Sequence, residues 1–247
     1  MPTPDKNKAA LEGLIAKANA ATGGDAATVT DAVDTLIAGF GQGGGGGNDL
    51  SAYLTSMQWS FSGADFTDNP DINISLKRAV TNIRSAFEGT TGVETITLSC
   101  PESDSGVNVT STFAGCPARV IDLSRFPIKI GGGATNMFAR TRNLTEIKGE
   151  LDFSLCTGTA NMFRDGGASI IQLREIRFKQ GTINTLDNSY LWQANLLSDA
   201  SIQSIIDGLA DLTGSTAQTL RLHADVGAKL TDAQKAAASA KNWTLAY

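Results

Sequence analysis

Four acidic residues in the middle of the chain are the side chains whose type and spacing could support a reaction. They are Glu146, Glu150, Asp152 and Glu175, and a glycan hydrolase uses two such carboxyl groups, one with its pKa raised by an apolar pocket. The surrounding sequence indicates neither an apolar pocket nor a His-based pair that would shift a pKa. Acids on a repetitive surface are usually solvated, so we do not favour paired-carboxylate hydrolysis.

The other chemistry-bearing residues form no catalytic or metal-binding motif. His223 is the single histidine and has no Ser or Cys at a nucleophile turn to pair with, so we interpret it as a surface residue or a residue of the C-terminal cap. Cys100, Cys116 and Cys156 are an odd number of cysteines at wide spacing. This predicts small buried hydrophobic side chains rather than a disulfide framework or a zinc site.

The glycine clusters at residues 131–133 and 166–167 do not resemble nucleotide-binding loops. They lack the Lys-Ser/Thr or G-x-G-x-x-G context of such loops, so we interpret them as tight corners of the chain. The sequence therefore predicts a protein that is not an enzyme, with no catalytic residue, no cofactor and no metal.

Charge and hydropathy exclude further classes of function. The formal net charge of -5 and the pI near 4.9 argue against nucleic acid as a partner, because neutralising phosphates takes a clustered excess of Lys and Arg. No apolar run approaches the roughly 18 residues that cross a bilayer, so no membrane insertion is expected. Residues 1–6 are polar and lack the apolar core of a signal peptide. We therefore expect synthesis in the cytoplasm without export by that route.

The elements that would position any site follow from a pattern that recurs four times between residues 84 and 178. Each copy has a Phe and, about six to ten residues later, a hydrophobic-x-x-Ile-x-hydrophobic segment. The aromatic residues Phe87, Phe113, Phe138 and Phe163 lie 26, 25 and 25 residues apart. A fixed period in this range predicts a solenoid, because each unit is too small to bury its own apolar face and must stack on its neighbours.

Side chains alternate within each strand segment, so the Ile residues should point inward and the residues between them outward. In a parallel sheet the outward residues of successive repeats would align as columns, with Glu146 beside Glu175 and Lys148 beside Arg177. Like charges side by side are unfavourable unless diagonal partners or a ligand offset them, so this face is a candidate contact surface. The alternative is a solvated sheet face with diagonal ion pairs. The candidate binding face comprises Asp122, Glu146, Lys148, Glu175, Arg177 and Arg221.

The segments around the repeats predict an anchor, a linker and caps. Residues 1–40 have two apolar stripes at helical spacing and predict a helical hairpin for anchoring or assembly, and the glycine-rich residues 41–48 predict a tether. Residues 49–247 would then form one capped repeat domain. Within it, residues 57–61 alternate like a capping strand, and residues 71–87 have the apolar spacing of a helix that leads into the first repeat.

The C-terminal part of the chain predicts a second cap. A helical stripe that follows Ser198, a strand at 219–223 that would add Arg221 to the basic column, and an Ala-rich helix after Thr231 come in that order. Residues 243–245 predict a final short strand.

Parts of the repeat resemble a known family. The segments Thr112-Phe113-Ala114-Gly115-Cys116-Pro117, Asn136-Met137-Phe138 and Asn161-Met162-Phe163, with the Ile-x-Leu segments after them, are similar to BspA-type leucine-rich repeats, in which a Phe-x-x-Cys corner precedes a Leu-x-x-Ile strand. The resemblance covers residues 80–180, and the Cys is kept only at Cys116. It implies an α+β fold: a short leucine-rich-repeat-like solenoid with parallel strands, helical caps and the N-terminal helical hairpin.

The flanks resemble structural proteins encoded by phages and prophages of gut bacteria. The similar segments are residues 18–44, with the sequence Thr-Asp-Ala-Val-Asp-Thr-Leu-Ile-Ala-Gly-Phe-Gly-Gln-Gly-Gly at their end, and residues 220–246. The resemblance implies a non-enzymatic bacteriophage virion protein, associated with the tail or baseplate or resembling a fibre. It would be made in the host cytoplasm and located in the virion.

Two further readings of function stay open beside this one. In the favoured hypothesis residues 1–40 bind other virion proteins or form a homo-oligomer, for which a trimer is one arrangement, and the repeat domain binds a host-surface glycan or protein. In the second, the protein is a capsid or head decoration or fibre protein that contacts only the virion. In the third, it is an adhesin-like repeat protein of a bacterial surface.

Overall fold

Short segments in which β-branched residues alternate with polar ones form a parallel sheet. In Asp71–Ser75, for example, Ile72 and Ile74 are buried while Asp71, Asn73 and Ser75 are exposed. The computed structural model describes residues 48–49, 56–76, 79–102, 104–166, 171–186 and 188–247. The predicted hairpin at 1–40, and all of the predicted tether except Asn48, lie outside these residues.

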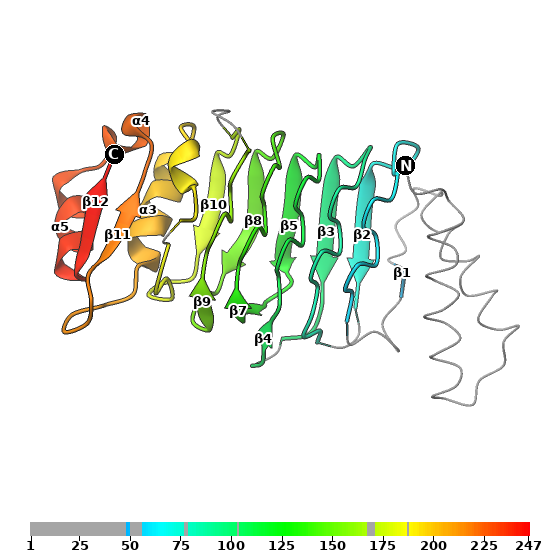
Figure 1. The fold of residues 1–247 in the computed structure, drawn as a ribbon, viewed down its shortest axis with the longest axis horizontal. Coiled ribbons are helices and arrows are strands. Elements are labelled where there is room, and N and C mark those ends of the chain that lie inside the picture. The colour runs from blue at the N-terminus through cyan, green and yellow to red at the C-terminus, as the bar shows by residue number, and fades with distance from the viewer. Residues whose placement is uncertain (1–47, 50–55, 77–78, 103, 167–170, 187) are drawn as a thin grey trace, which may run out of the picture.

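Within the described residues, six strands form this sheet in the order β1-β2-β3-β5-β8-β10, each parallel to the next (Figure 1). They are β1 (Asn48–Asp49), β2 (Asp71–Ser75), β3 (Thr95–Ser99), β5 (Val120–Arg125), β8 (Glu146–Leu151) and β10 (Glu175–Phe178). Ile72, Ile96, Ile121 and Ile147 are partners in register and are at most 2% exposed. The predicted inward direction of the repeat isoleucines is therefore confirmed.

Stacked phenylalanine rings line the interior opposite the sheet. The ring centroids of Phe61, Phe87, Phe113, Phe138 and Phe163 are 5.3, 5.6, 5.5 and 5.5 Å apart, and the interplanar angles do not exceed 14°. Offset stacking at such distances is favourable beyond the burial of the rings. We call this row the phenylalanine ladder. Each ring belongs to one coil, by which we mean the stretch of chain that leads from one strand of the sheet to the next.

A second set of backbone hydrogen bonds holds the coils together at the phenylalanine ladder. The N–H group of each ladder Phe donates to the residue before the next ladder position, as in Phe87 to the carbonyl of Thr112 and Phe113 to that of Met137, at 2.8 and 2.9 Å. The sheet supplies the same kind of bond on the other side of each coil. Both sides of a coil are thus tied to its neighbour, which fixes the length of the repeat.

Four strands of two or three residues form two further pairs outside the main sheet. They are β4 (Gly106–Val107) with β6 (Lys129–Ile130), and β7 (Gly132–Gly133) with β9 (Cys156–Gly158). At this corner a Cβ atom on Gly131 would lie 2.6 Å from the Cα of Gly106, so both positions need glycine for the coils to approach. The expectation that residues 131–133 form a tight corner is confirmed.

A helix takes the place of the next strand after β10. Helix α3 (Asp199–Gly208) lies along β10 in Figure 1. Its serine hydroxyl groups accept hydrogen bonds from the N–H groups at the free edge of that strand: Ile176 donates to Ser201 at 3.0 Å and Phe178 to Ser204 at 2.9 Å. Ser198 caps the helix as predicted, with its side chain accepting from the N–H group of Ser201. An edge strand with unpaired N–H groups invites further pairing, and α3 closes this edge.

The remaining elements complete the C-terminal cap. They are the 3-10 helix η2 (Leu191–Gln193), β11 (Gln218–Arg221), α4 (Ala224–Gly227), α5 (Asp232–Ala240) and β12 (Trp243–Ala246). Thr231 begins α5 with a capping box that includes Gln234, and β11 pairs with β12 in a separate parallel sheet. The predicted strands at 219–223 and 243–245 and the helix after Thr231 are confirmed.

Two predictions at the start of the domain are wrong. Residues 57–61 form a turn, with Trp59 at φ 61°, and Phe61 is the first ring of the phenylalanine ladder. The predicted helix at 71–87 is instead strand β2 followed by turns. The apolar residues after Leu76 lie at helical spacing and are buried, yet the described residues of this segment form bends and turns and no helix.

The described chain is thus a mixed α+β structure, dominated by parallel sheet and with few helices. Its buried apolar residues form one core that extends from Met57 to Trp243. None of the described helices has the length and apolar character needed to cross a membrane.

The phenylalanine ladder predicts a large effect of Phe113→Ala. The ring of Phe113 is fully buried between two others, so its removal should lower the free energy of unfolding by about 3–5 kcal/mol. Urea unfolding followed by circular dichroism measures this. Trp59→Ala is the control, because that side chain is 51% exposed and its loss should change stability by less than about 1 kcal/mol. Equal effects of the two variants would contradict the ladder's role.

Candidate functional site

The predicted binding face is the outer surface of the parallel sheet, and the structure brings most of its residues together. Thr97, Asp122 and Lys148 are register partners on β3, β5 and β8. Glu146 and Glu175 are partners on β8 and β10, so their predicted juxtaposition is confirmed. These side chains are exposed or half-buried, whereas the alternate residues are buried.

A bulge changes the register of this face between β8 and β10. Gly149 has φ +90°, and a Cβ there would lie 2.7 Å from the carbonyl carbon of Leu123, so the kink requires glycine. Beyond the bulge Arg177 is the partner of Glu150. The predicted pairing of Lys148 with Arg177 is therefore wrong, because a uniform register was assumed and two extra residues on β8 shift it.

Charges on this face are largely offset by neighbours. Asp122 lies beside Lys148, and Arg177 lies beside Glu150. Burial raises the pKa of Asp122, but hydrogen bonds from Ser124 and the positive charges of Lys148 and Arg125 outweigh it and hold that pKa below its usual value. The Glu175 carboxylate accepts hydrogen bonds from the hydroxyl groups of Ser198 and Ser201, at 2.8 and 3.2 Å. This arrangement fits a solvated sheet face as well as a contact surface.

Arg221 does not belong to this face. It lies on β11, which pairs with β12, and α3 separates that pair from β10 (Figure 1). The prediction that Arg221 extends the basic column is therefore wrong: a helix occupies the position where the next strand would have continued the sheet.

Arg221 instead borders a surface hollow that the sequence reasoning did not identify. The hollow has a volume of about 280 Å³ and is lined by Leu186, Asn188, Ser189, Tyr190, Trp192 and Arg221. We call it the aromatic hollow. The Tyr190 and Trp192 ring centroids are 5.9 Å apart at an angle of 36°, and the guanidinium carbon of Arg164 lies 5.7 Å from the centroid of the Tyr190 ring.

Tyr190 stands where the next phenylalanine of the ladder would be. The N–H group of Phe163 donates to the carbonyl of Ser189, which is the bond that each earlier ladder Phe makes to the residue before the next ring. Tyr190 has φ 60°, and its side chain is only half-buried, while Leu191 is fully buried. The sixth aromatic residue has therefore left the core. Its spacing of 27 residues from Phe163, followed by Trp192, was the available signal.

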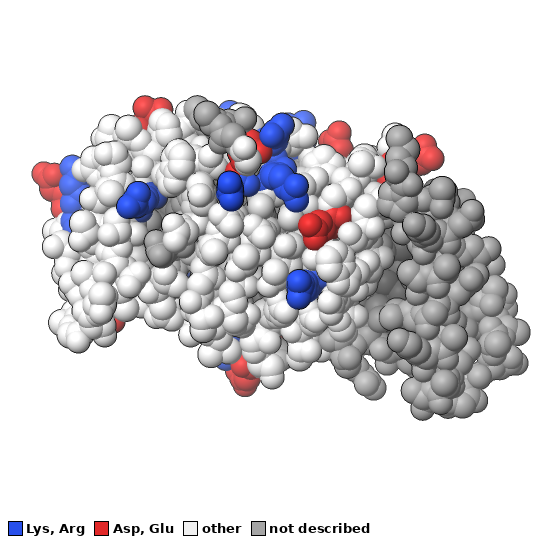
Figure 2. Space-filling model, in the orientation of Figure 1, with Lys and Arg blue, Asp and Glu red and all other residues white. Residues whose placement is uncertain are grey.

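A second hollow lies on the other side of Arg164. It has a volume of about 210 Å³, and Glu88, Ser111, Asn136, Arg140 and Arg164 are among its lining residues. We call it the arginine hollow. Figure 2 shows basic side chains gathered over the coils of β8 and β10, on a face that is otherwise mostly uncharged.

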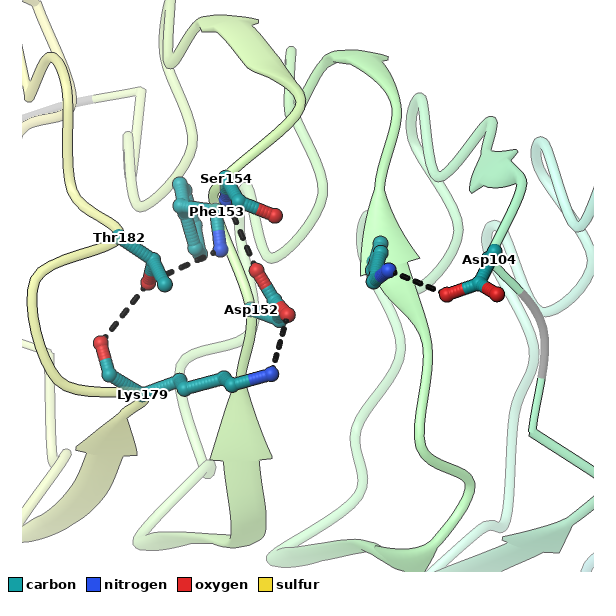
Figure 3. A network of polar contacts seen from close by, with 7 residues as sticks. Asp104, Asp152, Phe153, Ser154, Lys179 and Thr182 are labelled. Carbon is teal, nitrogen blue, oxygen red and sulfur yellow. Dashed lines mark hydrogen bonds and ion pairs between the residues drawn. The ribbon is translucent and has the colours of Figure 1, made fainter.

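Asp152, one of the four acids whose type and spacing could support a reaction, belongs to a structural network (Figure 3). Its carboxylate accepts from the Ser154 N–H group and from the Lys179 ammonium group, both at 2.9 Å. Thr182 accepts from the Phe153 N–H group and donates to the carbonyl of Lys179, at 3.2 and 2.8 Å. Burial raises the pKa of Asp152, but the bonds from Ser154 and the Lys179 charge lower it below its usual value. A general acid needs a raised pKa.

The remaining candidates have structural surroundings. His223 lies in the C-terminal cap, where it begins α4 and its ring nitrogen accepts from the Asp225 N–H group at 3.2 Å. Cys116 and Cys156 are buried as predicted, and Cys100 is half-buried. Burial raises the pKa of the Cys100 thiol to about 11, so it is protonated at neutral pH and a poor nucleophile. Among the described residues, no group of His, Cys, Asp or Glu side chains could hold a metal ion.

Comparisons with models of protein families, with curated proteins and with solved structures gave no match to this chain.

The bulge at Gly149 predicts which charged residues interact. In double-mutant cycles with Glu150→Gln, Lys148→Gln and Arg177→Gln, Glu150 and Arg177 should couple by about 0.2–1 kcal/mol, the range for opposite charges on neighbouring strands. Lys148 and Arg177 should show no coupling above the measurement error. Urea unfolding at low salt measures both, and a larger coupling for the second pair would contradict the shifted register.

The Asp152 network predicts a pH dependence of stability. A carboxyl group whose pKa is lower in the folded protein than in the unfolded chain adds stability above the unfolded value, near 3.9, and this stability is lost as the pH falls through the folded pKa. Asp152→Asn should lower the free energy of unfolding by about 1–3 kcal/mol at pH 7 and by clearly less at pH 2.5. Asp68→Asn, at an exposed turn, is the control. An equal loss for Asp152→Asn at both pH values would contradict the assignment.

Proposed function

We propose that the protein is a non-enzymatic structural protein of a bacteriophage virion, associated with the tail or baseplate or resembling a fibre. Its described part is a short leucine-rich-repeat-like solenoid that presents a binding surface to a host-surface glycan or protein. Residues 1–40 attach it to other virion proteins or assemble it into a homo-oligomer, with a trimer as one arrangement.

The observation that carries the proposal is one continuous core with a closed C-terminal end. The core extends from Met57 to Trp243. The serine side chains of α3 accept hydrogen bonds from the N–H groups at the edge of β10. Such a stack extends its surface in one direction, with each coil adding a row of side chains at fixed positions. This geometry suits the display of a binding surface.

The arrangement along the chain supports attachment through the other end. Before the core come five consecutive glycines at residues 43–47, and before those two amphipathic stretches. A glycine run has no side chains to pack and a large entropy to lose on ordering. The assignment to a phage rests on the resemblance of residues 18–44 and 220–246 to phage and prophage structural proteins.

Deletion of residues 1–47 should separate folding from assembly. The truncated chain should keep the circular dichroism spectrum and urea midpoint of the intact domain, because the described core begins at Met57. It should be monomeric by light scattering and absent from purified particles, whereas the intact chain is present in them. Full-length Gly45→Ser is the matched control, and it should be incorporated normally. Incorporation of the truncated chain at the intact level would contradict the proposal.

Binding to host cells distinguishes display from a purely internal role in the virion. The intact protein, labelled with a fluorophore, should bind host cells and not cells of unrelated bacteria. A decoration protein that contacts only the virion would bind neither.

A further inference from the structure

The contact between Arg164 and Tyr190 links the two hollows, and we treat them as one candidate site. Arg164 lines the arginine hollow, and its guanidinium group lies over the ring of Tyr190 in the aromatic hollow. Arg140 stands on one side of Arg164, and Arg221 on the other. Among the residues named as lining the hollows, these three arginines face a single acid, Glu88. The site is therefore basic in a protein with a formal net charge of -5.

The aromatic rings of this site are exposed where the fold would bury them. Tyr190 occupies a ladder position, and the five preceding rings at that position pack into the ladder. Trp192 is 42% exposed. Large aromatic side chains lose the benefit of burial when they are displayed, so ladder packing does not account for this pair. A partner that covers the rings would account for it.

One of the non-glycine residues with positive φ that recur along the stack lies in this site. Gly63, Gly89 and Gly115, which lie two residues after a ladder Phe, have φ 70, 64 and 69°. The equivalent position of the next coil is Arg140, which has φ 60°. Left-handed conformations are unfavourable for residues other than glycine and cluster at ligand sites. A bulky arginine thus replaces the favoured glycine at the rim of the arginine hollow.

The chemistry of the lining residues defines the ligand class. The exposed ring of Trp192, with the half-buried Tyr190 beside it, suits the apolar face of a sugar ring, and the amide of Asn188 and the hydroxyl of Ser189 suit its hydroxyl groups. A guanidinium group binds a carboxylate through two parallel hydrogen bonds. A volume of about 280 Å³ lies below the usual range for drug-sized ligands, which fits a single ring. The adjoining hollow would take the next one.

We propose that the aromatic hollow and the arginine hollow together bind an acidic glycan, with one carboxylated sugar stacked on Trp192 and Tyr190 and its carboxylate at Arg221. Arg140 and Arg164 bind the carboxylate of a neighbouring sugar. This inference deepens the proposed function and rests on it only for the biological source of the glycan, an acidic polysaccharide of a cell surface.

Isothermal titration calorimetry of the intact chain tests the site with three carboxylated probes. They are tetragalacturonate, a glucuronate-containing tetrasaccharide and sialyllactose, and at least one should bind. The methyl ester of the bound probe keeps the rings and removes the charge, so it should bind at least about tenfold more weakly. Absence of binding by all three at millimolar concentration, or equal binding of the ester, overturns the proposal.

Variants locate the binding. Trp192→Ala and Arg221→Gln should each weaken binding at least about tenfold. Trp59→Ala is the matched control, because Trp59 is also an exposed tryptophan of a coil turn, at the other end of the described stack, and it should bind like the wild type. Equal weakening by Trp59→Ala and Trp192→Ala overturns the assignment.

Arg140→Gly separates binding from folding. Glycine is the residue of the earlier coils, so this variant should keep or raise the urea midpoint and still weaken binding of the acidic probe. A lower midpoint with unchanged affinity would mean that Arg140 serves the fold, which overturns its role in the site. The virion and cell-binding assays use the intact chain without these probes, so failure of glycan binding leaves the proposed function standing.

Discussion

Hydrogen bonding on two sides of each coil is the constraint on which the rest of the structure depends. The sheet ties one side of a coil to its neighbour, and the bonds at the phenylalanine ladder tie the other. Neighbouring strands must lie about 4.8 Å apart, and the rings follow this spacing with a small offset, at 5.3–5.6 Å between centroids. The rings from Phe61 to Phe163 keep a period of 25–26 residues, which places one ring in each coil.

The same constraint explains how the stack ends. A coil at the end has backbone groups with no further coil to bond, and the chain satisfies them with a helix whose serine hydroxyls replace a strand. At the last aromatic position Tyr190 turns outward while Leu191 fills the core. The aromatic hollow lies there, where the repeat changes into the cap.

The sequence predicts the regular part of the fold and misses the exceptions to it. The spacing of Phe and Ile identifies the stacked rings and the buried positions of the parallel strands, and capping residues such as Ser198 and Thr231 identify helices, because both signals are local. Residues 71–87 mislead because their apolar spacing fits a helix, while the hydrogen bonds that make β2 a strand come from another coil. The bulge at Gly149 and the separate position of Arg221 depend on contacts that no local pattern encodes. The predicted face is therefore assembled only in part.

Charge on the sheet face and exposed aromatic rings at the hollows indicate different surfaces as the place of function. On the sheet face most charges have a neighbour that offsets them, as Lys148 does for Asp122, and the Glu175 carboxylate beside Glu146 accepts hydrogen bonds from Ser198 and Ser201. On the face of the hollows, Arg140 replaces a favoured glycine and two aromatic rings remain outside the core. Each of these features lowers the stability of the isolated chain. A surface whose features lower the stability of the isolated chain is explained by a bound partner, whereas a surface that adds stability needs no partner to explain it. The hollows therefore carry the stronger case for recognition.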